Sequence, residues 1–548
     1  MAEKFLGWWR EDKRYITMIK ALLLALLPVL CCVVYCASQG RSIGQVYLPN
    51  SVWNDELLYY KQVEGSVGFG YPQGYFGYDE SHALKLSFAV WSPVLMFPWA
   101  VWGKLFGWNL MSPILCNIFL MMFCCFFYVW LVKPSWKQLG LLALLFCLYT
   151  PFVRYMLSGM PEVICFSMLI LFYSLALNYL EKEKGWKLAL LLGMSAIMTL
   201  MRPYFFLFLL LPVYFWVRRD RWKGAIGSVI AMALTMGLYA CINHYLCAKY
   251  LATSYYTDWV TAFFEQGIGG GFLYTLRKLR SVGKDFCLYI VEAFRSGMAA
   301  GAFFAGYIVM LCIFIVEGLR DYFSLRWKHR QKMIAGKVST DADFENKTQA
   351  NRLIIEIHIV FSFVAMLIAL LLIYKLTEGS KHFLTFMAAG IFVVPLLPTR
   401  HYKKTALLGL TFAFFYSYMA VNPYDYQVPF VTAERRESVE KWKEALEGEM
   451  RLKEGDTPSF DNVVIWVTGD VTADGAAGTE WQLFYSLPEG FGISCCQQAY
   501  VLENFDTLKS GYMATVTGGH IDGMCRDAGY RELYHDSSMI LYVIGRQY

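Results

Sequence analysis

Long apolar runs alternate with short polar segments over the first 421 residues of the 548-residue chain. A helix that crosses a membrane needs about 20 apolar residues, or somewhat fewer when it lies inside a bundle. The pattern therefore predicts about eleven spanning helices, near residues 17–38, 113–132, 138–152, 160–180, 187–201, 203–217, 224–246, 301–316, 353–374, 384–398 and 405–421. The first run exceeds the length of a signal-peptide core and no small-residue cleavage site follows a shorter one, so we expect an uncleaved anchor.

Two polar segments between the predicted helices, 39–112 and 247–300, are much longer than a connection requires. In the first, His82–Phe106 has the pattern of an amphipathic helix that lies on the membrane surface. The second contains a glycine-rich turn from Gly267 and a basic stretch, Arg277–Lys284. Neither internal repeats nor matching interrupted helices occur, which argues against an inverted-repeat transporter.

The pattern changes after residue 421. Thr432–Leu452 is a charged segment with a helical apolar face that includes Val439, Trp442 and Leu446. Apolar runs then predict buried strands at Asn462–Thr468, Gly492–Cys496, Tyr512–Val516 and Met539–Val543, with short helices such as Ile521–Asp527 between them. This alternation predicts a small α/β domain. The expected fold class is mainly α: a polytopic transmembrane bundle in residues 1–421, followed by an α/β domain in 422–548.

Composition and charge exclude a soluble multidomain protein and a bare helical channel. Hydrophobic residues make up 57% of the chain and charged residues 17%, whereas soluble domains average about 45–50% and 25%. The net charge of +6 divides unevenly: residues 1–421 hold 39 Lys and Arg against 23 Asp and Glu, and residues 422–548 hold 10 against 20. A basic membrane part therefore precedes an acidic domain.

The distribution of Lys and Arg predicts the orientation. With the N-terminus in the cytoplasm, the inner segments hold 24 Lys and Arg in 76 residues and the outer segments hold 14 in 148. An odd number of helices then places the C-terminal domain outside the cytoplasmic membrane, and an error of one helix would reverse that. Among the cysteines, Cys525 could pair with Cys495 or Cys496, or all could be free. No cysteine or histidine spacing indicates a structural metal site.

Adjacent carboxylates, Asp55 and Glu56, follow the first apolar run in the string SVWNDELLYYKQ. They could simply be solvated acids in the first turn of a surface helix. The same loop continues with Asp79, Glu80 and His82 among many Tyr and Gly residues. Aromatic rings with fixed polar groups are typical of a sugar-binding surface, where a carboxylate can act as a general base toward a hydroxyl.

Single charged residues stand at the predicted outer helix ends: Arg154, Glu162, Arg202, Lys381 and His382. Each could be a snorkelling side chain or a marker of topology. Together they gather on the side of the membrane that has few cations. Ionisable groups at helix ends that face a bundle are candidates for function, and cations at the headgroup level suit a phosphate group. The Arg277–Lys284 stretch could serve the same purpose or hold a surface helix on anionic lipid.

This arrangement resembles the GT-C superfamily of integral-membrane glycosyltransferases, in the group similar to protein mannosyltransferases and aminoarabinose transferases. Asp55-Glu56 followed by Tyr59 resembles the family's DE-x-x-Y string. Lys381-His382-Phe383-Leu384 resembles its Arg-Tyr-Leu-Pro helix start, but with Lys for Arg, His for Tyr and no proline. The likeness covers most of the chain in architecture and only a few residues in motif.

The resemblance implies transfer of a sugar from a polyprenyl-phosphate donor to a hydroxyl of a glycan, lipid or protein acceptor at the outer membrane face, with inversion. Asp55 would be the general base, assisted by Glu56. Arg202, Lys381, His382 and Arg154 would stabilise the departing phosphate. The remaining candidates for substrate contacts are Tyr59, Asp79, Glu80, His82 and Glu162.

The same residues are compatible with a bound metal ion and with functions other than sugar transfer. A divalent cation on Asp55 or Glu56 is compatible with them, although no feature of the sequence requires a metal or another cofactor. Membrane lipids are expected partners, and nucleic acid is not. The alternatives are a transporter or flippase for lipid-linked saccharides and a non-catalytic membrane assembly protein. Asp55→Asn and Glu56→Gln variants separate these from the enzyme.

Overall fold

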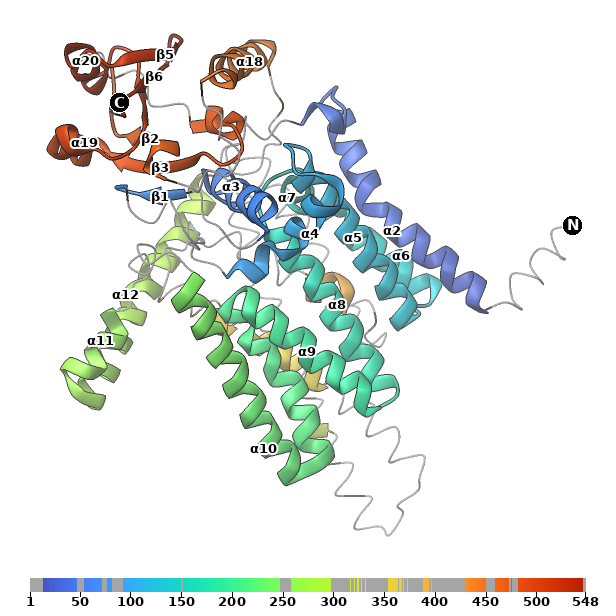
Figure 1. Cartoon of the computed structure of the whole chain (residues 1–548). Helices are drawn as coiled ribbons and strands as arrows, with labels where there is room; N and C mark the ends of the chain where they lie inside the picture. Colours follow the sequence, from blue (N-terminus) through green and yellow to red (C-terminus); the bar gives the residue numbers. More distant parts are fainter. Residues whose placement is uncertain are drawn as a thin grey trace, which may run out of the picture.

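The computed structural model describes residues 13–46, 54–70, 76–80, 92–148, 151–246, 258–296, 432–449, 459–472 and 481–545, with short stretches and single residues between 316 and 396, Phe430 and Gly475. Figure 1 shows an elongated helical bundle with a sheet domain at one end. The bundle contains α2 (Lys13–Ser38), α5 (Ser112–Val132), α6 (Trp136–Leu148), α8 (Glu162–Glu181), α9 (Gly185–Met201) and α10 (Phe206–Leu246). Within it, α5 packs between α2 and α8, and α9 packs against α10.

Four of the described helices are long and apolar enough to cross a membrane by length and composition: Arg14–Ser38, Ser112–Val132, Glu162–Glu181 and the 44-residue stretch Pro203–Leu246. Shorter apolar helices lie at Trp136–Cys147, Gly185–Met201 and Leu353–Met366. These positions confirm helices where the first seven apolar runs predict them. The predicted span 405–421 lies outside the described residues, 301–316 is described only at Val316, and 353–374 and 384–398 are described only in part, so the count of eleven stays a prediction.

Helix α10 reverses its direction at Arg221, where the backbone has φ 44° and ψ −114°. A β-carbon on Gly224 would lie 2.3 Å from the carbonyl oxygen of Trp216, and one on Gly227 would meet the Trp216 ring. In a continuous helix, residues eight apart are separated by about 12 Å along the axis. The close approach shows that α10 folds back on itself, in agreement with the separate runs predicted at 203–217 and 224–246.

The long polar segments contain helices that lie beside the bundle. The first holds η1 (Ile43–Gln45), α3 (Asn54–Phe69), η3 (Pro93–Met96) and α4 (Phe97–Phe106), and a short helix, α7 (Pro151–Met156), precedes α8. The predicted helix His82–Phe106 is described from residue 92 onward, where η3 and α4 occupy it. The second segment forms α11 (Asp258–Glu265) and α12 (Gly267–Ser296), which extend away from the bundle (Figure 1).

The C-terminal domain, described within residues 432–545, is built on a six-stranded sheet of order β1-β3-β2-β4-β6-β5. Strands β2 (Val463–Thr468), β3 (Gly492–Gln497), β4 (Tyr512–Val516) and β6 (Met539–Val543) lie at the predicted positions. Their apolar side chains are buried almost completely, as expected of strands covered on both faces. Helices α18 (Ala433–Glu447), α19 (Gln498–Asn504) and α20 (His520–Asp527) complete the α/β domain, together with η9 (Trp481–Ser486) and η10 (Phe505–Thr507).

Two strands were not predicted from the sequence. Strand β5 (Arg531–His535) pairs antiparallel with β6 at one edge. Strand β1 (Phe76–Tyr78) comes from the first polar segment, nearly 400 residues earlier in the chain, and pairs in parallel with β3: Phe76 is opposite Ile493 and Tyr78 is opposite Cys495. The first polar segment is therefore joined to the C-terminal domain by main-chain hydrogen bonds.

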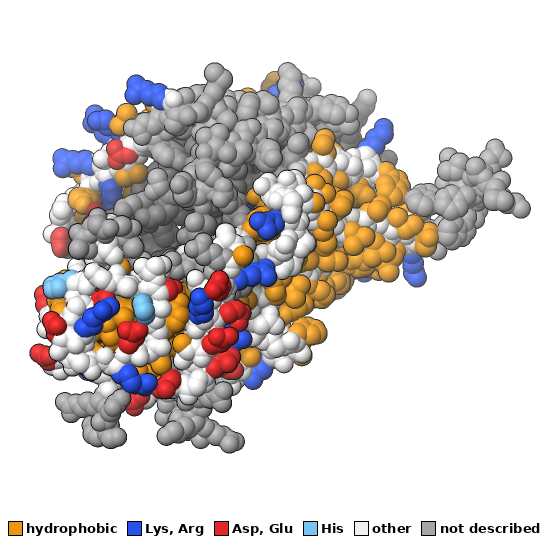
Figure 2. Space-filling view, turned by 90° about the horizontal axis from the view of Figure 1, so that it is seen from above, with side chains coloured by type: hydrophobic (Ala, Val, Ile, Leu, Met, Phe, Trp, Pro, Cys, Tyr) orange, Lys and Arg blue, Asp and Glu red, His pale blue; other side chains and the backbone are white. Residues whose placement is uncertain are grey.

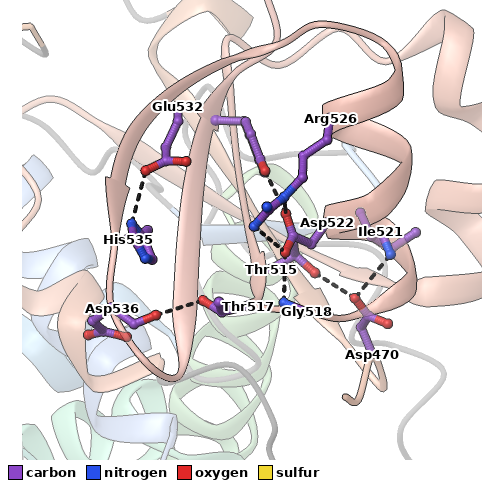
Figure 3. A network of polar contacts seen from close by, with 11 residues as sticks. Asp470, Thr515, Thr517, Gly518, Ile521, Asp522, Arg526, Glu532, His535 and Asp536 are labelled. Atoms are coloured by element: carbon purple, nitrogen blue, oxygen red, sulfur yellow. Dashed lines mark hydrogen bonds and ion pairs between the residues drawn. The ribbon is translucent and has the colours of Figure 1, made fainter. Parts of the chain in front are cut away.

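Polar side chains tie the helices of the C-terminal domain to its sheet. The Asp470 carboxylate accepts hydrogen bonds from Thr515 Oγ1 (2.8 Å) and from the Ile521 amide of α20 (3.3 Å), and Asp522 accepts from Tyr542 and Arg526 (Figure 3). On α18, Val439, Trp442 and Leu446 are buried, as the predicted apolar face requires. Cys495, Cys496 and Cys525 are all free thiols.

The surface of the molecule differs between the helical bundle and the C-terminal domain in the type of its side chains. Figure 2 shows a broad hydrophobic surface over one flank of the helical bundle, whereas acidic and basic side chains mingle over the C-terminal domain. Exposed Leu22, Leu26, Leu30 and Val34 repeat at a spacing of four residues along α2. Apolar side chains that face outward along a whole helix are expected where lipid is the solvent. The division agrees with a membrane part followed by a water-exposed domain.

Candidate active site

The carboxylate pair predicted from the sequence begins helix α3. Asp55 and Glu56 both lie in its first turn, where unpaired backbone N–H groups favour negative charge. Glu56 is fully buried, and Asp55 is half-buried beside it. Neighbouring residues of a helix point in directions about 100° apart. The Glu56 carboxylate therefore points into the protein interior, and the Asp55 carboxylate points toward a partly exposed side of the helix.

Glu56 is held by the segment between α7 and α8. Its Oε2 atom accepts a hydrogen bond from the backbone amide of Gly159 (3.0 Å), and its Oε1 atom lies 3.6 Å from Nη2 of Arg154. Arg154 is also buried. Burial lowers the pKa of this guanidinium, and the negative charge of Glu56 opposes that change. A buried charge is tolerated when it is paired and hydrogen-bonded, so Glu56 has a fixed orientation.

A buried asparagine supports the same segment, and the sequence reasoning missed it. Asn117 of α5 donates from Nδ2 to the carbonyl oxygen of Ser158 (3.1 Å), and its Oδ1 accepts from Trp99 Nε1 (2.9 Å). The amide of Asn117 thus fixes the loop that binds Glu56. Its signal in the sequence was a polar residue inside an apolar run, which marks a candidate for function in a membrane helix.

A second ion pair joins two more of the predicted residues. Nη2 of Arg202 lies 2.8 Å from Oε1 of Glu162, and both side chains are fully buried. Nη1 of Arg202 donates to the Tyr204 hydroxyl at 3.1 Å. Tyr59, one turn beyond Asp55 on α3, lies close enough to Arg202 to interact with its charge. The structure thus brings Tyr59, Glu162 and Arg202 together.

Asp79 and Glu80 lie apart from these pairs, at the end of β1. Glu80 is buried, and its Oε1 atom accepts hydrogen bonds from the backbone amides of Lys509 and Ser510 and from Ser510 Oγ, at 2.6–2.9 Å. Its own amide donates to Ser494 Oγ at 2.8 Å. Glu80 therefore binds the first polar segment to the C-terminal domain, whereas Asp79 is exposed. His82, Lys381 and His382 lie outside the described residues.

An apolar groove lies beside the other end of α3. It has a volume of about 540 Å³ and is lined by Ser66 and Gly70 of the α3 end, by residues of η3 and α4, and by Ile242 and Leu246 of α10. Lys104 is the one charged residue among its described lining residues. Ser66 and Asp55 are eleven residues apart on one helix, about 16 Å along its axis. The groove offers space for a hydrocarbon chain near a cation.

No group of three or more His, Cys, Asp or Glu side chains in the described part of the chain could hold a metal ion. The basic stretch Arg277–Lys284 lies on α12, where Arg277, Arg280 and Lys284 are exposed. Lys278 instead forms an ion pair with Asp258 of α11. The stretch thus belongs to the α11–α12 hairpin rather than to the ion pairs around α3.

Comparison with known proteins gives one structural likeness. The chain is similar to the crystal structure of ArnT from Cupriavidus metallidurans bound to undecaprenyl phosphate, with 12% sequence identity and a TM-score of 0.41, over 95% of this chain and 97% of that chain. No protein-family model matches the sequence, and no curated protein matches it. At this TM-score the likeness assigns no role to any residue, so the roles proposed below rest on the contacts of this chain.

Proposed function

We propose that this protein is a membrane glycosyltransferase that moves a sugar from a polyprenyl-phosphate donor to an acceptor hydroxyl, with the reaction at the outer face of the cytoplasmic membrane. The observation that carries the proposal is the Asp55–Glu56 pair. Glu56 is buried and fixed by Arg154 and the Gly159 amide, and Asp55 remains half-buried next to it. A solvated pair of acids at a helix start would have no need of a buried guanidinium.

The proposed chemistry is a single displacement. Asp55 takes the proton of the acceptor hydroxyl as its oxygen attacks the anomeric carbon, and the bond from that carbon to the phosphate oxygen breaks on the opposite face. The sugar is transferred with inversion, and the polyprenyl phosphate leaves with the bonding electrons. A general base of this kind contributes about 10²- to 10⁴-fold to the rate. The acceptor remains one of three classes: a glycan, a lipid or a protein.

Stabilising the negative charge on the departing phosphate requires cations in addition to the two buried arginines. Arg154 faces Glu56 and Arg202 faces Glu162, so each guanidinium is already balanced by a carboxylate. In this proposal Lys381 and His382 supply the additional positive charge, and Arg202 orients the phosphate together with Tyr204. Stabilising charge that develops in the transition state is the usual main source of catalysis.

The test uses purified protein in lipid nanodiscs with a panel of polyprenyl-phosphate sugars and candidate acceptors. Wild-type protein should release polyprenyl phosphate and yield a product with inverted anomeric configuration, which NMR measures. Asp55→Asn should lower kcat by about 10²- to 10⁴-fold, and Glu56→Gln should also lower it. Glu503→Gln, which changes an exposed carboxylate of α19, is the matched control and should keep full activity.

Full activity in both Asp55→Asn and Glu56→Gln would overturn the catalytic roles. No transfer by the wild-type protein across the panel would instead favour a lipid-linked saccharide transporter or an assembly protein. A vesicle assay of lipid-linked sugar movement separates those two, since only the transporter changes the leaflet in which the sugar is found.

A further inference from the structure

Among the described residues, the stretch Trp481–Glu489, which contains η9, joins the C-terminal domain to the helix that carries Asp55 and Glu56. Its Leu483 and Phe484 are fully buried. The Phe484 ring lies 5.9 Å from the rings of both Trp442 and Trp466 in the core of the domain. These contacts anchor the stretch to its own domain, so its next residue, Tyr485, holds a defined position.

Tyr485 packs on helix α3. Its ring centroid lies 5.3 Å from that of Tyr60, and Tyr60 in turn lies 5.3 Å from Trp108. Residues four apart share one face of a helix, so Tyr485 packs on the face of α3 that carries Glu56. Tyr485 is buried together with its hydroxyl.

The electrostatic environment of Tyr485 agrees with that placement. Burial raises the pKa of its hydroxyl well above the ordinary value, with a further increase from the charge of Glu56 and an opposing effect of Arg154. The hydroxyl is therefore protonated and uncharged at physiological pH, so Tyr485 adds no charge to the interior that holds the Glu56–Arg154 pair.

The stretch Trp481–Glu489 contacts α3 at two further positions. Buried Lys61 donates from Nζ to the carbonyl oxygen of Leu487 (3.2 Å) while it pairs with Glu64 (2.7 Å). Near the end of α3, Gly68 approaches Glu489 so closely that a β-carbon there would lie 2.5 Å from the carboxylate oxygen. The C-terminal domain thus contacts α3 at positions from Tyr60 to Gly68.

We propose that Tyr485 is a positioning residue of the active site: its ring packs on Tyr60, on the face of α3 that carries Glu56, so that the C-terminal domain sets the orientation of α3 and of the Asp55–Glu56 carboxylates at its start. The role of Asp55 and Glu56 in sugar transfer rests on the proposed function, whereas the positioning of α3 does not. In this proposal the C-terminal domain is therefore part of the active site, because it positions α3.

The experiment compares Tyr485→Phe, which removes only the hydroxyl, with Tyr485→Ala, which also removes the ring. Tyr534→Phe is the control, because Tyr534 is a buried tyrosine of the same domain whose hydroxyl donates to Asp536 and whose ring contacts Trp442. The full-length proteins are compared in nanodiscs by sugar-transfer kinetics and by hydrogen exchange of peptides that cover residues 54–69.

We expect Tyr485→Ala to lower kcat by about 100-fold, since a displacement of 1 Å at a site can cost that much. Tyr485→Phe should lower kcat less, the KM for donor should stay unchanged in both, and Tyr534→Phe should match wild type. Hydrogen exchange in α3 should become faster in Tyr485→Ala alone.

Unchanged α3 exchange and unchanged kcat in Tyr485→Ala would overturn the positioning role. So would equal losses in Tyr485→Ala and Tyr534→Phe, which would assign the effect to stability of the domain. Faster hydrogen exchange of α3 in Tyr485→Ala would support the positioning of α3 even if the wild-type protein transferred no sugar. The absence of sugar transfer would refute only the glycosyltransferase proposal.

Discussion

Two buried carboxylates at the start of α3 and at the end of β1 are bound by groups that lie far away in the sequence. Glu56 binds Gly159 and Arg154, and Glu80 binds Ser510. Asp522, by contrast, binds the nearby Arg526 and the more distant Tyr542. Glu56 and Glu80 are candidates in the sequence because of their residue type and their neighbours, but their partners are set by the fold. As a result, two residues that looked alike in the sequence have different surroundings: an ion pair at the start of α3 and a contact between domains.

The Glu56–Arg154 pair allows a test by double-mutant cycle. Removing one member of a buried ion pair leaves the other charge unbalanced and costs about 3–5 kcal/mol. We expect Arg154→Gln to lower the free energy of unfolding by an amount in that range, and Glu56→Gln with Arg154→Gln to cost less than the sum of the single changes. Thermal unfolding in detergent measures the three variants. Strict additivity would show that the two side chains do not interact.

Glu80 should contribute to the attachment between the first polar segment and the C-terminal domain. Glu80→Gln weakens a charge-assisted acceptor of three hydrogen bonds, which should lower stability by about 1–3 kcal/mol. Denaturant unfolding of the C-terminal domain, followed by tryptophan fluorescence, measures this change. Glu503→Gln on the exposed face of α19 provides the reference, and an equal effect of both substitutions would refute the attachment.

At the scale of helices and strands, the sequence pattern located most of the described elements. Apolar runs of helical length predicted the bundle helices, and short apolar runs predicted β2, β3, β4 and β6. Strand β5 was missed because Arg531–His535 carries charged and exposed side chains at the sheet edge. Strand β1 was missed because three residues, Phe76–Tyr78, become a strand only through pairing with β3.

The reversal of α10 depends on one glycine. A β-carbon at Gly224 would lie 2.3 Å from the Trp216 carbonyl oxygen, a backbone atom that cannot move aside easily. Gly224→Ala should therefore disrupt the turn and lower the thermal midpoint of the purified protein, despite the better helix propensity of alanine. Gly237→Ala changes the same helix at a position with open space and should be neutral or stabilising. Equal midpoints for the two variants would mean that the turn tolerates a side chain.

At the scale of the whole molecule, the C-terminal domain and the bundle share helix α3. Figure 1 shows α3, α4 and α7 between the sheet and the longer helices. The domain contacts α3 through Tyr485, Leu487 and Glu489, and it contains β1 as an added strand. A division of the chain at residue 421 describes the composition well, but residues 76–80 belong spatially to the later domain.

Acid should destabilise the C-terminal domain. Burial raises the pKa of Asp522, but hydrogen bonds from Arg526, Tyr542 and the Gly518 amide outweigh it, so the folded pKa is below the ordinary value. Asp536 is shifted in the same direction. A carboxylate with a lowered pKa stabilises the fold above its unfolded pKa of about 4, and that stability is lost as pH falls through the folded pKa.

Hydrogen exchange of peptides from the C-terminal domain, measured between pH 6 and pH 3 with correction for intrinsic rates, checks this expectation. Asp522→Asn should weaken the pH dependence, whereas Asp527→Asn, at an exposed position on the same helix, should leave it unchanged. Protection that does not fall between pH 4 and pH 3 would contradict the assignment.

The sequence alone determined the elements that depend on local pattern: apolar runs long enough for membrane helices, a charged segment with one apolar face, four buried strands and a pair of adjacent acids after the first helix. These follow from periodicity and residue type, which neighbours in the chain already encode. Only the tertiary structure decided that Glu56 is bound by Arg154 and Gly159, that Glu162 pairs with Arg202, and that Tyr485 packs on α3. Such contacts join residues 40–430 positions apart, and burial in a shared low-dielectric interior, rather than any local pattern, selects the partners.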